Sequence, residues 1–206
     1  VRRTSLTAMG GQQTIMSIGE PTSVGISNLY MRLSFLDDNS LTFAFTGNDL
    51  LTQTIGKKFE DLNAWVHLAF TYDSRPFPIS IPATKRCIYV NGVQLLCDSS
   101  SSHFIGVGRM ILGASAGVNG IGYADRFIGS IDAIRIHGPM PAGQLGAGTC
   151  ILPADVLCLA TSDPILSGQF PLYLAWNFAE QKEVTIADSS GQGRGGSLAL
   201  GISRSE

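Results

Sequence analysis

The sequence predicts an all-β protein of antiparallel strands, and two observations lead to this prediction. From residue 14 to residue 136, apolar stretches of about four to eight residues, rich in β-branched and aromatic side chains, alternate with polar turn residues. Glycine accounts for 24 of the 206 residues, and apolar residues nowhere keep the spacing of a helix face beyond about two turns. Short strands joined by tight turns are typical of an antiparallel sandwich or barrel.

The charge balance and the length of the apolar runs exclude two classes of function. Fourteen lysines and arginines stand against 16 aspartates and glutamates, which gives a formal net charge of −2. The chain therefore lacks the basic surface that binding to nucleic acid requires. No apolar run reaches the roughly 18 residues of a membrane-spanning helix. We expect neither a nucleic-acid partner nor a membrane span.

The individual elements follow from local patterns. Strands are predicted over 29–35, 41–45, 65–72, 88–95, 110–113, 127–137 and 172–178. In the strand at 65–72 apolar side chains fall on both faces, which predicts a central strand with Trp65 in the core. The dipeptide Asn91-Gly92 predicts a type I′ hairpin turn, because both residues tolerate positive φ. A short helix is predicted over 152–160, since Pro153 suits its first turn.

Four cysteines fall into two local pairs, Cys87 with Cys97 and Cys150 with Cys158. In a secreted protein this spacing predicts two disulfides, and in a cytosolic protein four buried thiols. A two-residue turn at 91–92 places Cys87 opposite Leu96, so a bridge to Cys97 requires a bulge. We expect the two local disulfides and an extracellular protein, although four cysteines also allow cross-pairings.

Four motifs together resemble a known family. Residues 65–73 read WVHLAFTYD, which resembles the W-x-H-x-A-x-T-Y-D strand of laminin-G-like jelly rolls in the concanavalin A-like lectin/glucanase superfamily. YVNG at 89–92, ILG at 111–113 and FIGSIDAIRI at 127–136 resemble the family's hairpin, its L-L-G strand and its closing strand. The resemblance covers residues 1–145 and implies an antiparallel jelly-roll β-sandwich.

A fifth motif occurs out of the family's order. LAWNF at 174–178 and DSSGQG at 188–193 resemble the segment that opens the family's domain, yet here they close the chain. We therefore expect a jelly roll over 1–145 that lacks its opening strands, a linker with a short helix over 146–171, and an opening-strand motif over 172–206. The motif completes this domain, the next repeat or a neighbouring chain. Among these alternatives we favour exchange with a neighbouring chain or repeat, with self-association through residues 172–200.

Catalytic residues are not expected. The resemblance to glucanases implies a Glu-x-Asp-x-x-Glu strand, and none of the five glutamates has that spacing: Glu20, Glu60, Glu180, Glu183 and Glu206. The three histidines lie in different segments, and no Gly-x-Ser-x-Gly motif is present. We predict a protein that is not an enzyme.

The same resemblance implies one Ca²⁺, with Asp132 and Asp188 as its ligands. Asp132 matches the aspartate of the closing motif and Asp188 that of the opening motif, so we expect the two to lie close together. Asp132 shares the parity of Ile134 and Ile136, which predicts an inward carboxylate unless a bulge intervenes. The alternative is that both aspartates accept backbone N–H groups at turns.

These observations predict a non-catalytic extracellular or cell-surface module for binding, adhesion or structural repetition. The ligand is a carbohydrate or a protein. A carbohydrate-binding module of a larger enzyme and a glycoside hydrolase are the alternatives. Tyr123 and Phe104 fall in predicted loops and are the candidates for stacking on a sugar, while Trp65 and Trp176 are expected in the core.

Overall fold

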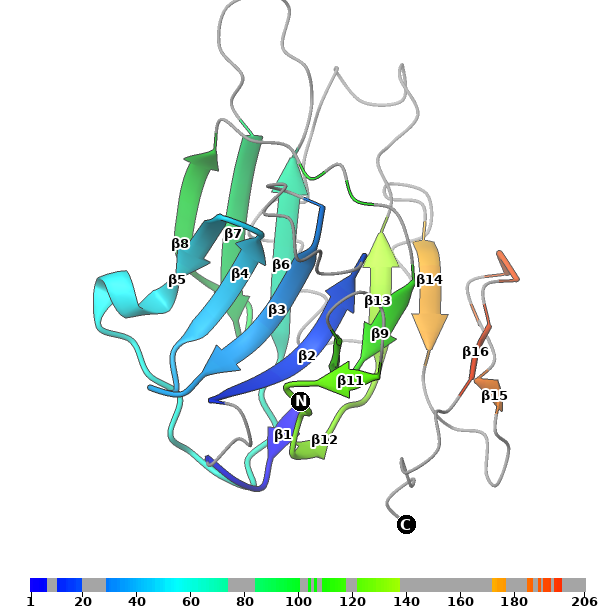
Figure 1. Cartoon of the computed structure of the whole chain (residues 1–206), viewed down its shortest axis with the longest axis horizontal. Helices are drawn as coiled ribbons and strands as arrows, with labels where there is room; N and C mark the ends of the chain where they lie inside the picture. Colours follow the sequence, from blue (N-terminus) through cyan, green and yellow to red (C-terminus); the bar gives the residue numbers. More distant parts are fainter. Residues whose placement is uncertain are drawn as a thin grey trace, which may run out of the picture. The chain divides into compact units, whose positions relative to one another are not determined.

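A computed structural model shows that the regular structure of the described residues is mostly β-strand with antiparallel pairing, as predicted (Figure 1). The structure describes residues 1–6, 11–19, 29–73, 84–100, 104, 106, 109–117, 122–137, 172–176, 185–186, 189, 191–193 and 195–197. The chain divides into two compact units, residues 1–129 and residues 130–206. Among the described residues, no helix has the length and apolarity that crossing a bilayer requires.

One sheet of the first unit has five strands in the order β5-β4-β3-β2-β9 (Figure 1). Their bounds are β2 Gln12–Ile18, β3 Met31–Leu36, β4 Leu41–Phe45, β5 Asn48–Leu51 and β9 Met110–Leu112. A single turn of 3₁₀ helix, η1 (Thr52–Ile55), follows β5. The turns at 37–40 and 46–47 are short, so β3, β4 and β5 form a meander of neighbouring antiparallel strands.

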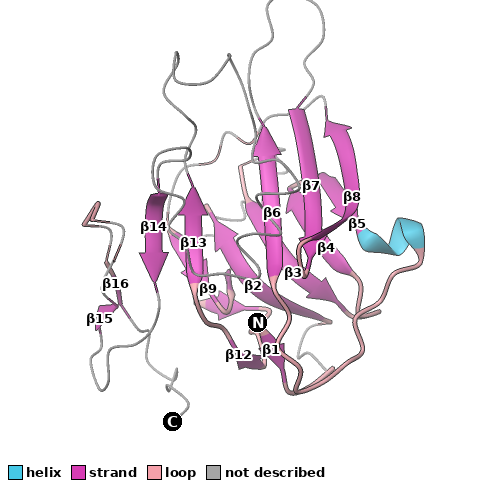
Figure 2. Cartoon of the chain, turned by 180° about the vertical axis from the view of Figure 1, so that it is seen from behind, coloured by secondary structure: helices cyan, strands magenta, loops and turns pink. Residues whose placement is uncertain are grey.

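The other sheet of this unit has the order β6-β7-β8, with β6 Leu68–Asp73, β7 Thr84–Val90 and β8 Val93–Ser100 (Figure 2). Aromatic contacts join the two sheets face to face. The ring centroids of Phe43 and Phe70 lie 5.7 Å apart, and those of Phe45 and Tyr72 lie 5.0 Å apart. The unit is therefore a β-sandwich whose core fills the space between the sheets.

Strand alternation explains which side chains form this core. Leu33, Phe43 and Leu50 are paired across three neighbouring strands and all are buried. On the opposite sheet Ile88 is fully buried. Burying one such side chain contributes about 1.5–3 kcal/mol, so this alternating face accounts for much of the stability of the unit.

The β7–β8 hairpin has the turn, the bulge and the disulfide that the sequence predicts. Asn91 and Gly92 both have positive φ, 50° and 79°. Tyr89 pairs with Gln94 but Ile88 pairs with Leu96, so a bulge restores the register and places Cys87 directly opposite Cys97. Their sulfurs are bonded, with the Cα atoms 4.1 Å apart. The prediction of a Cys87–Cys97 bridge is confirmed, whereas Cys150 and Cys158 lie outside the described residues.

The remaining strands are short. In the first unit these are β1 (Arg2–Arg3) and the pair of β10 (Ser115–Ala116) with β11 (Tyr123–Ala124); β12 (Gly129–Ser130) lies at the boundary between the units. In the second unit β13 (Ile134–His137) pairs with β14 (Leu172–Trp176), and β15 (Thr185–Ile186) pairs with β16 (Gly196–Ser197). The predicted linker and helix, residues 146–171, lie outside the described residues.

Two predictions about strands are wrong. The strand expected over 127–137 is interrupted, because Ala133 has a φ of 51° and cannot continue an extended strand. The strand expected from residue 65 begins only at Leu68, and β7 rather than β6 is the middle strand of its sheet. Trp65 precedes that strand and is 53% exposed, so it is not a core residue.

Candidate functional site

The structure places Asp132 on the surface. Its Oδ1 accepts a hydrogen bond of 2.7 Å from the N–H of Ala133, and its side chain is exposed. Because Ala133 leaves the extended conformation, Asp132 does not follow the inward parity of Ile134 and Ile136. The expected inward carboxylate is therefore wrong, and Asp132 accepts a backbone N–H at a turn, as the alternative proposed.

The strands that carry the closing and opening motifs are neighbours within this chain. Ile134 pairs with Trp176 and Arg135 with Ala175. The N–H and the hydroxyl of Ser189 both donate to the carbonyl of Ala175, at 2.9 and 3.1 Å, which ties the D-S-S-G turn to β14. Asp188 itself lies outside the described residues, so its proximity to Asp132 stays a prediction. Within the described part of the chain, no three His, Cys, Asp or Glu side chains gather as metal ligands do.

A second group of polar residues lies on the outer face of the five-stranded sheet. Register places Ser17, Arg32, Ala44 and Asp49 in one row across β2, β3, β4 and β5. This row faces away from the core, since the alternate residues Leu33 and Phe43 form the core. We call the group the Arg32 cluster and define it as Ser17, Tyr30, Arg32, Asp49, Ser115 and Asp125.

Asp125 reaches this face because the chain turns sharply after β11. Its φ is 47°, and its carbonyl accepts a 2.7 Å bond from the N–H of Thr14 in β2. Its Oδ2 accepts a 3.1 Å hydrogen bond from Ser115 and lies 3.9 Å from Nη1 of Arg32. Both side chains of this ion pair are 21% exposed, so solvent reaches the pair.

The surroundings of Arg32 shift two neighbouring groups. Burial raises the pKa of Tyr30, while the hydroxyls of Ser17 and Ser115 oppose that shift, so Tyr30 stays a neutral phenol at physiological pH. Desolvation also raises the pKa of Asp49, and the positive charge of Arg32 works in the opposite direction. Solvent reaches the charged members of the cluster, Arg32, Asp49 and Asp125, whereas Ser17, Tyr30 and Ser115 are buried. One cation beside two carboxylates suits a neutral ligand rich in hydroxyl groups better than an anion.

The aromatic residues that the sequence suggests for stacking on a sugar differ in exposure. Tyr123 is 44% exposed on β11, two residues from Asp125. Phe104 instead contacts Phe45, with ring centroids 5.6 Å apart, and its N–H donates to the hydroxyl of Tyr72. Trp65 is exposed with the guanidinium of Arg2 5.2 Å from its ring centroid. The side chain of Trp176 lies outside the described part.

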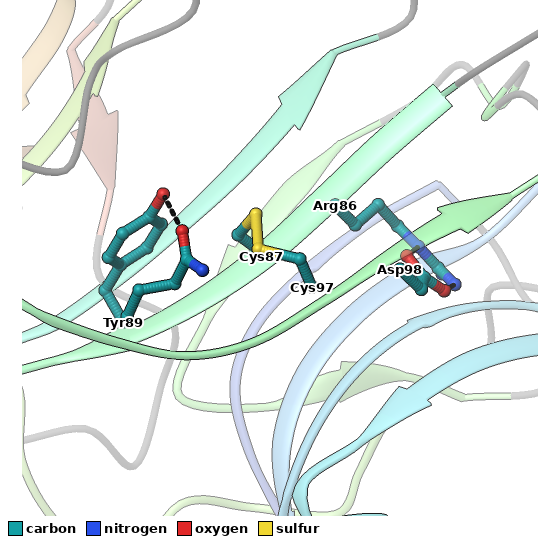
Figure 3. Close-up of a disulfide and its surroundings, with 6 residues drawn as sticks. Arg86, Cys87, Tyr89, Cys97 and Asp98 are labelled. Carbon is teal, nitrogen blue, oxygen red and sulfur yellow. Dashed lines mark hydrogen bonds and ion pairs between the residues drawn. A yellow bond between two sulfur atoms is a disulfide. The ribbon is translucent and has the colours of Figure 1, made fainter.

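A buried arginine joins the two sheets and is structural. Arg86 of β7 is fully buried between them and is paired with Asp98 of β8 (Figure 3). All five of its N–H groups are used: Nε and Nη2 on Asp98, Nη1 on the carbonyls of Phe43 and Asn48, and Nη2 on Oδ1 of Asn48. Its guanidinium also lies 4.8 Å from the ring centroid of Phe45. Figure 3 shows the disulfide next to this pair along the same two strands.

Sequence reasoning missed both arginine groups. The members of the Arg32 cluster come from segments as far apart as residues 17 and 125 and belong to no motif. A signal for Arg86 was present, because it shares strand parity with Ile88, and Ile88 is a core residue.

Comparison with known protein families shows which family the chain matches. A laminin G family model, described as the concanavalin A-like lectin/glucanases superfamily, matches residues 1–140. No curated protein and no solved structure matches the chain. The matched range contains the four in-order motifs and ends before β14, in agreement with the extent expected from those motifs.

Proposed function

Since the chain belongs to the concanavalin A-like lectin/glucanases superfamily, we propose that it is a non-catalytic module that binds a hydroxyl-rich ligand, a carbohydrate, outside the cell. The observation that carries this proposal is the Arg32 cluster, with Tyr123 exposed beside it. Carboxylates accept hydrogen bonds from sugar hydroxyls, and a guanidinium donates hydrogen bonds to them. A tyrosine ring provides an apolar face against which a sugar ring packs.

The contacts of the aspartates support a role without catalysis. Asp98 holds Arg86, Asp38 accepts two bonds from Ser40, and Asp132 accepts the N–H of its own turn. Glycoside hydrolysis needs two carboxyl groups facing each other about 5–9.5 Å apart across a substrate, whereas these carboxylates are already engaged in holding turns and strands.

The disulfide supports the extracellular location. Cys87 of β7 and Cys97 of β8 are bonded across the hairpin, and such bonds persist in oxidising compartments. The laminin G type of the family model points in the same direction. A module for adhesion or a repeat of a larger surface protein fits both observations.

A calcium ion held by Asp132 and Asp188 is part of the proposal. Calcium prefers carboxylate and carbonyl oxygens, and the exposed carboxylate of Asp132 is of this type. The pairing of β13 with β14, together with the bonds from Ser189 to Ala175, brings the two motifs onto adjacent strands. Calorimetric titration of calcium into the protein is expected to show binding that Asp132→Asn weakens, and heat identical in both proteins would contradict the site.

The test of the binding function is titration with a panel of neutral and acidic oligosaccharides. Arg32→Gln and Tyr123→Ala are expected to weaken binding of a retained sugar by about tenfold each, or 1.4 kcal/mol. Gln53→Ala, an exposed change on η1, is the matched control. Binding that both cluster variants leave unchanged would contradict the proposal, and release of reducing sugar would favour the hydrolase alternative.

A further inference from the structure

The side chain of Arg32 is bonded far less completely than that of Arg86. Its ion pair with Asp125 spans 3.9 Å from Nη1 to Oδ2, which is longer than a hydrogen bond. Its Nε is buried, and no acceptor in the described part of the chain lies within hydrogen-bond distance of it. A guanidinium carries five N–H donors, so Arg32 has donors available to a ligand that approaches from solvent.

Asp125, in contrast, is fixed by two hydrogen bonds. Its carbonyl accepts the N–H of Thr14 at 2.7 Å, and its Oδ2 accepts the hydroxyl of Ser115 at 3.1 Å. Ser115 is buried, whereas the side chain of Asp125 is 21% exposed. An ionised carboxylate accepts about four hydrogen bonds through its two oxygens, so this carboxylate keeps acceptor capacity on the side that solvent reaches.

The separation of Nη1 and Oδ2 fits one bridging oxygen. Two hydrogen bonds of about 2.8 Å that meet at one oxygen at roughly a right angle join atoms about 4 Å apart. Such an oxygen accepts from Arg32 and donates to Asp125. Among the common functional groups of sugars, a hydroxyl does both, whereas an ether or carboxylate oxygen has no hydrogen to donate and an ammonium group has no lone pair.

The charges around the pair disfavour acidic sugars. Register places Asp49 in the same row as Arg32, two strands away, and Asp49 is exposed. Two carboxylates beside one guanidinium give the site a net negative charge, which repels a carboxylate or sulfate group. A neutral hydroxyl avoids this repulsion and uses both members of the pair.

We propose that Arg32 and Asp125 together recognise one free hydroxyl group of a neutral sugar, which accepts from the guanidinium and donates to the carboxylate. This inference rests on the proposed carbohydrate-binding function and adds the chemical group that is recognised. Ser115 is a positioning residue, because it holds Oδ2 of Asp125 from the buried side. Tyr123, on the strand that pairs with the strand of Ser115, supplies the exposed ring beside the pair.

The first experiment uses the unmodified protein. The probes are the methyl glycosides of glucose, galactose and mannose with their monodeoxy and mono-O-methyl derivatives, and NMR titration measures each Kd. At one ring position, both derivatives are expected to bind about tenfold more weakly than the parent, because both lack the hydrogen that Asp125 accepts. The proposal is wrong if no position behaves in this way, or if the O-methyl derivative binds as the parent does where the deoxy derivative does not.

Variants then assign this hydroxyl to the pair. Arg32→Met and Asp125→Asn are each expected to reduce the tenfold difference between parent and deoxy sugar to about threefold, and the double variant to less than about twofold. Lys58→Met, which removes one positive charge from an exposed residue after η1, is the matched control and should keep the full difference.

Two outcomes separate this inference from the function on which it rests. A double variant that binds sugars more weakly but keeps the tenfold difference would overturn the inference and leave the proposed function intact. A wild-type protein that binds none of the parent glycosides and no neutral oligosaccharide would overturn both.

Discussion

Two arginine–aspartate pairs lie on opposite faces of the five-stranded sheet and differ in how completely they are bonded. Arg86 reaches its inner face from β7, is fully buried and uses every N–H group. Arg32 lies on the outer face, 3.9 Å from Asp125, with both side chains 21% exposed. The inner pair is saturated by the protein, whereas the outer pair keeps hydrogen-bonding capacity that a ligand can use.

The difference separates charge that serves the fold from charge that is available to the proposed binding function. Burying a guanidinium costs several kcal/mol of desolvation free energy, which is similar to the free energy gained by pairing it. A buried arginine is therefore stable only when each of its N–H groups has an acceptor. A partly exposed pair contributes about 0–1 kcal/mol, so the fold does not depend on it. Four predictions test this division, from the largest expected effect to the smallest.

The first prediction concerns the inner pair. Asp98→Asn keeps the shape but leaves Arg86 charged and places an amide donor against its Nη2. The free energy of unfolding is expected to fall by about 3 kcal/mol, the lower end for breaking a buried pair, because Asp98 is 30% exposed. Denaturant unfolding measures it. Replacing both residues together, Arg86→Met with Asp98→Leu, is expected to cost less than the single change, and a larger cost would contradict the role assigned to the unpaired charge.

The second prediction concerns the disulfide beside that pair. Cys87→Ser with Cys97→Ser removes a bond within one sheet, whereas the Arg86 contacts join two sheets. The chain-entropy model for a loop of this size gives a loss of about 2–3 kcal/mol. Thermal unfolding with and without reductant measures it. Equal stability of the oxidised and reduced wild-type protein would show that the hairpin register alone holds these strands.

The architecture could be predicted from sequence to the extent that local alternation decides it. The period of two in β3 and β4, the Asn91-Gly92 turn and the bulge required by Cys87–Cys97 all follow from neighbouring residues. The break at Ala133 does not, because alanine at positive φ has no local signature. The exposure of Trp65 likewise depends on where β6 begins, which pairing partners decide.

The Arg32 cluster could not be predicted for a different reason. Ser17, Arg32 and Asp49 become neighbours through the registers of three strand pairs, and one residue of slippage would turn each to the opposite face. Asp125 joins them through a tight turn at positive φ. The cluster is a product of tertiary register, whereas Asp132 could be named from a motif alone and lies on the surface, where it accepts the N–H of Ala133.

The third prediction concerns the outer pair. Asp125→Asn removes its charge and keeps an acceptor for Ser115, so the free energy of unfolding is expected to change by less than about 1 kcal/mol. The difference from wild type should shrink further in high salt, since the pair is exposed. Denaturant unfolding at low and high salt measures both effects. A loss as large as that of Asp98→Asn would contradict the division between the two faces.

The last prediction uses Asp38, a carboxylate held by Ser40, as the reference for both pairs. It accepts bonds from the N–H and the hydroxyl of Ser40, at 2.9 and 2.6 Å, and these bonds lower its pKa. A carboxyl group with a lowered folded-state pKa stabilises the protein above its unfolded pKa of about 4, and this contribution is lost as the pH falls through the lowered value. Asp38→Asn should therefore reduce stability at pH 7 by no more than about 0.5 kcal/mol, because solvent reaches Asp38 and asparagine keeps an oxygen acceptor for Ser40. The variant should also lose less stability than wild type between pH 5 and pH 2, roughly the range over which such a group titrates. Urea unfolding across this range measures the difference, and a variant that follows the wild-type pH profile at constant offset would show that Ser40 does not depend on the charge of Asp38.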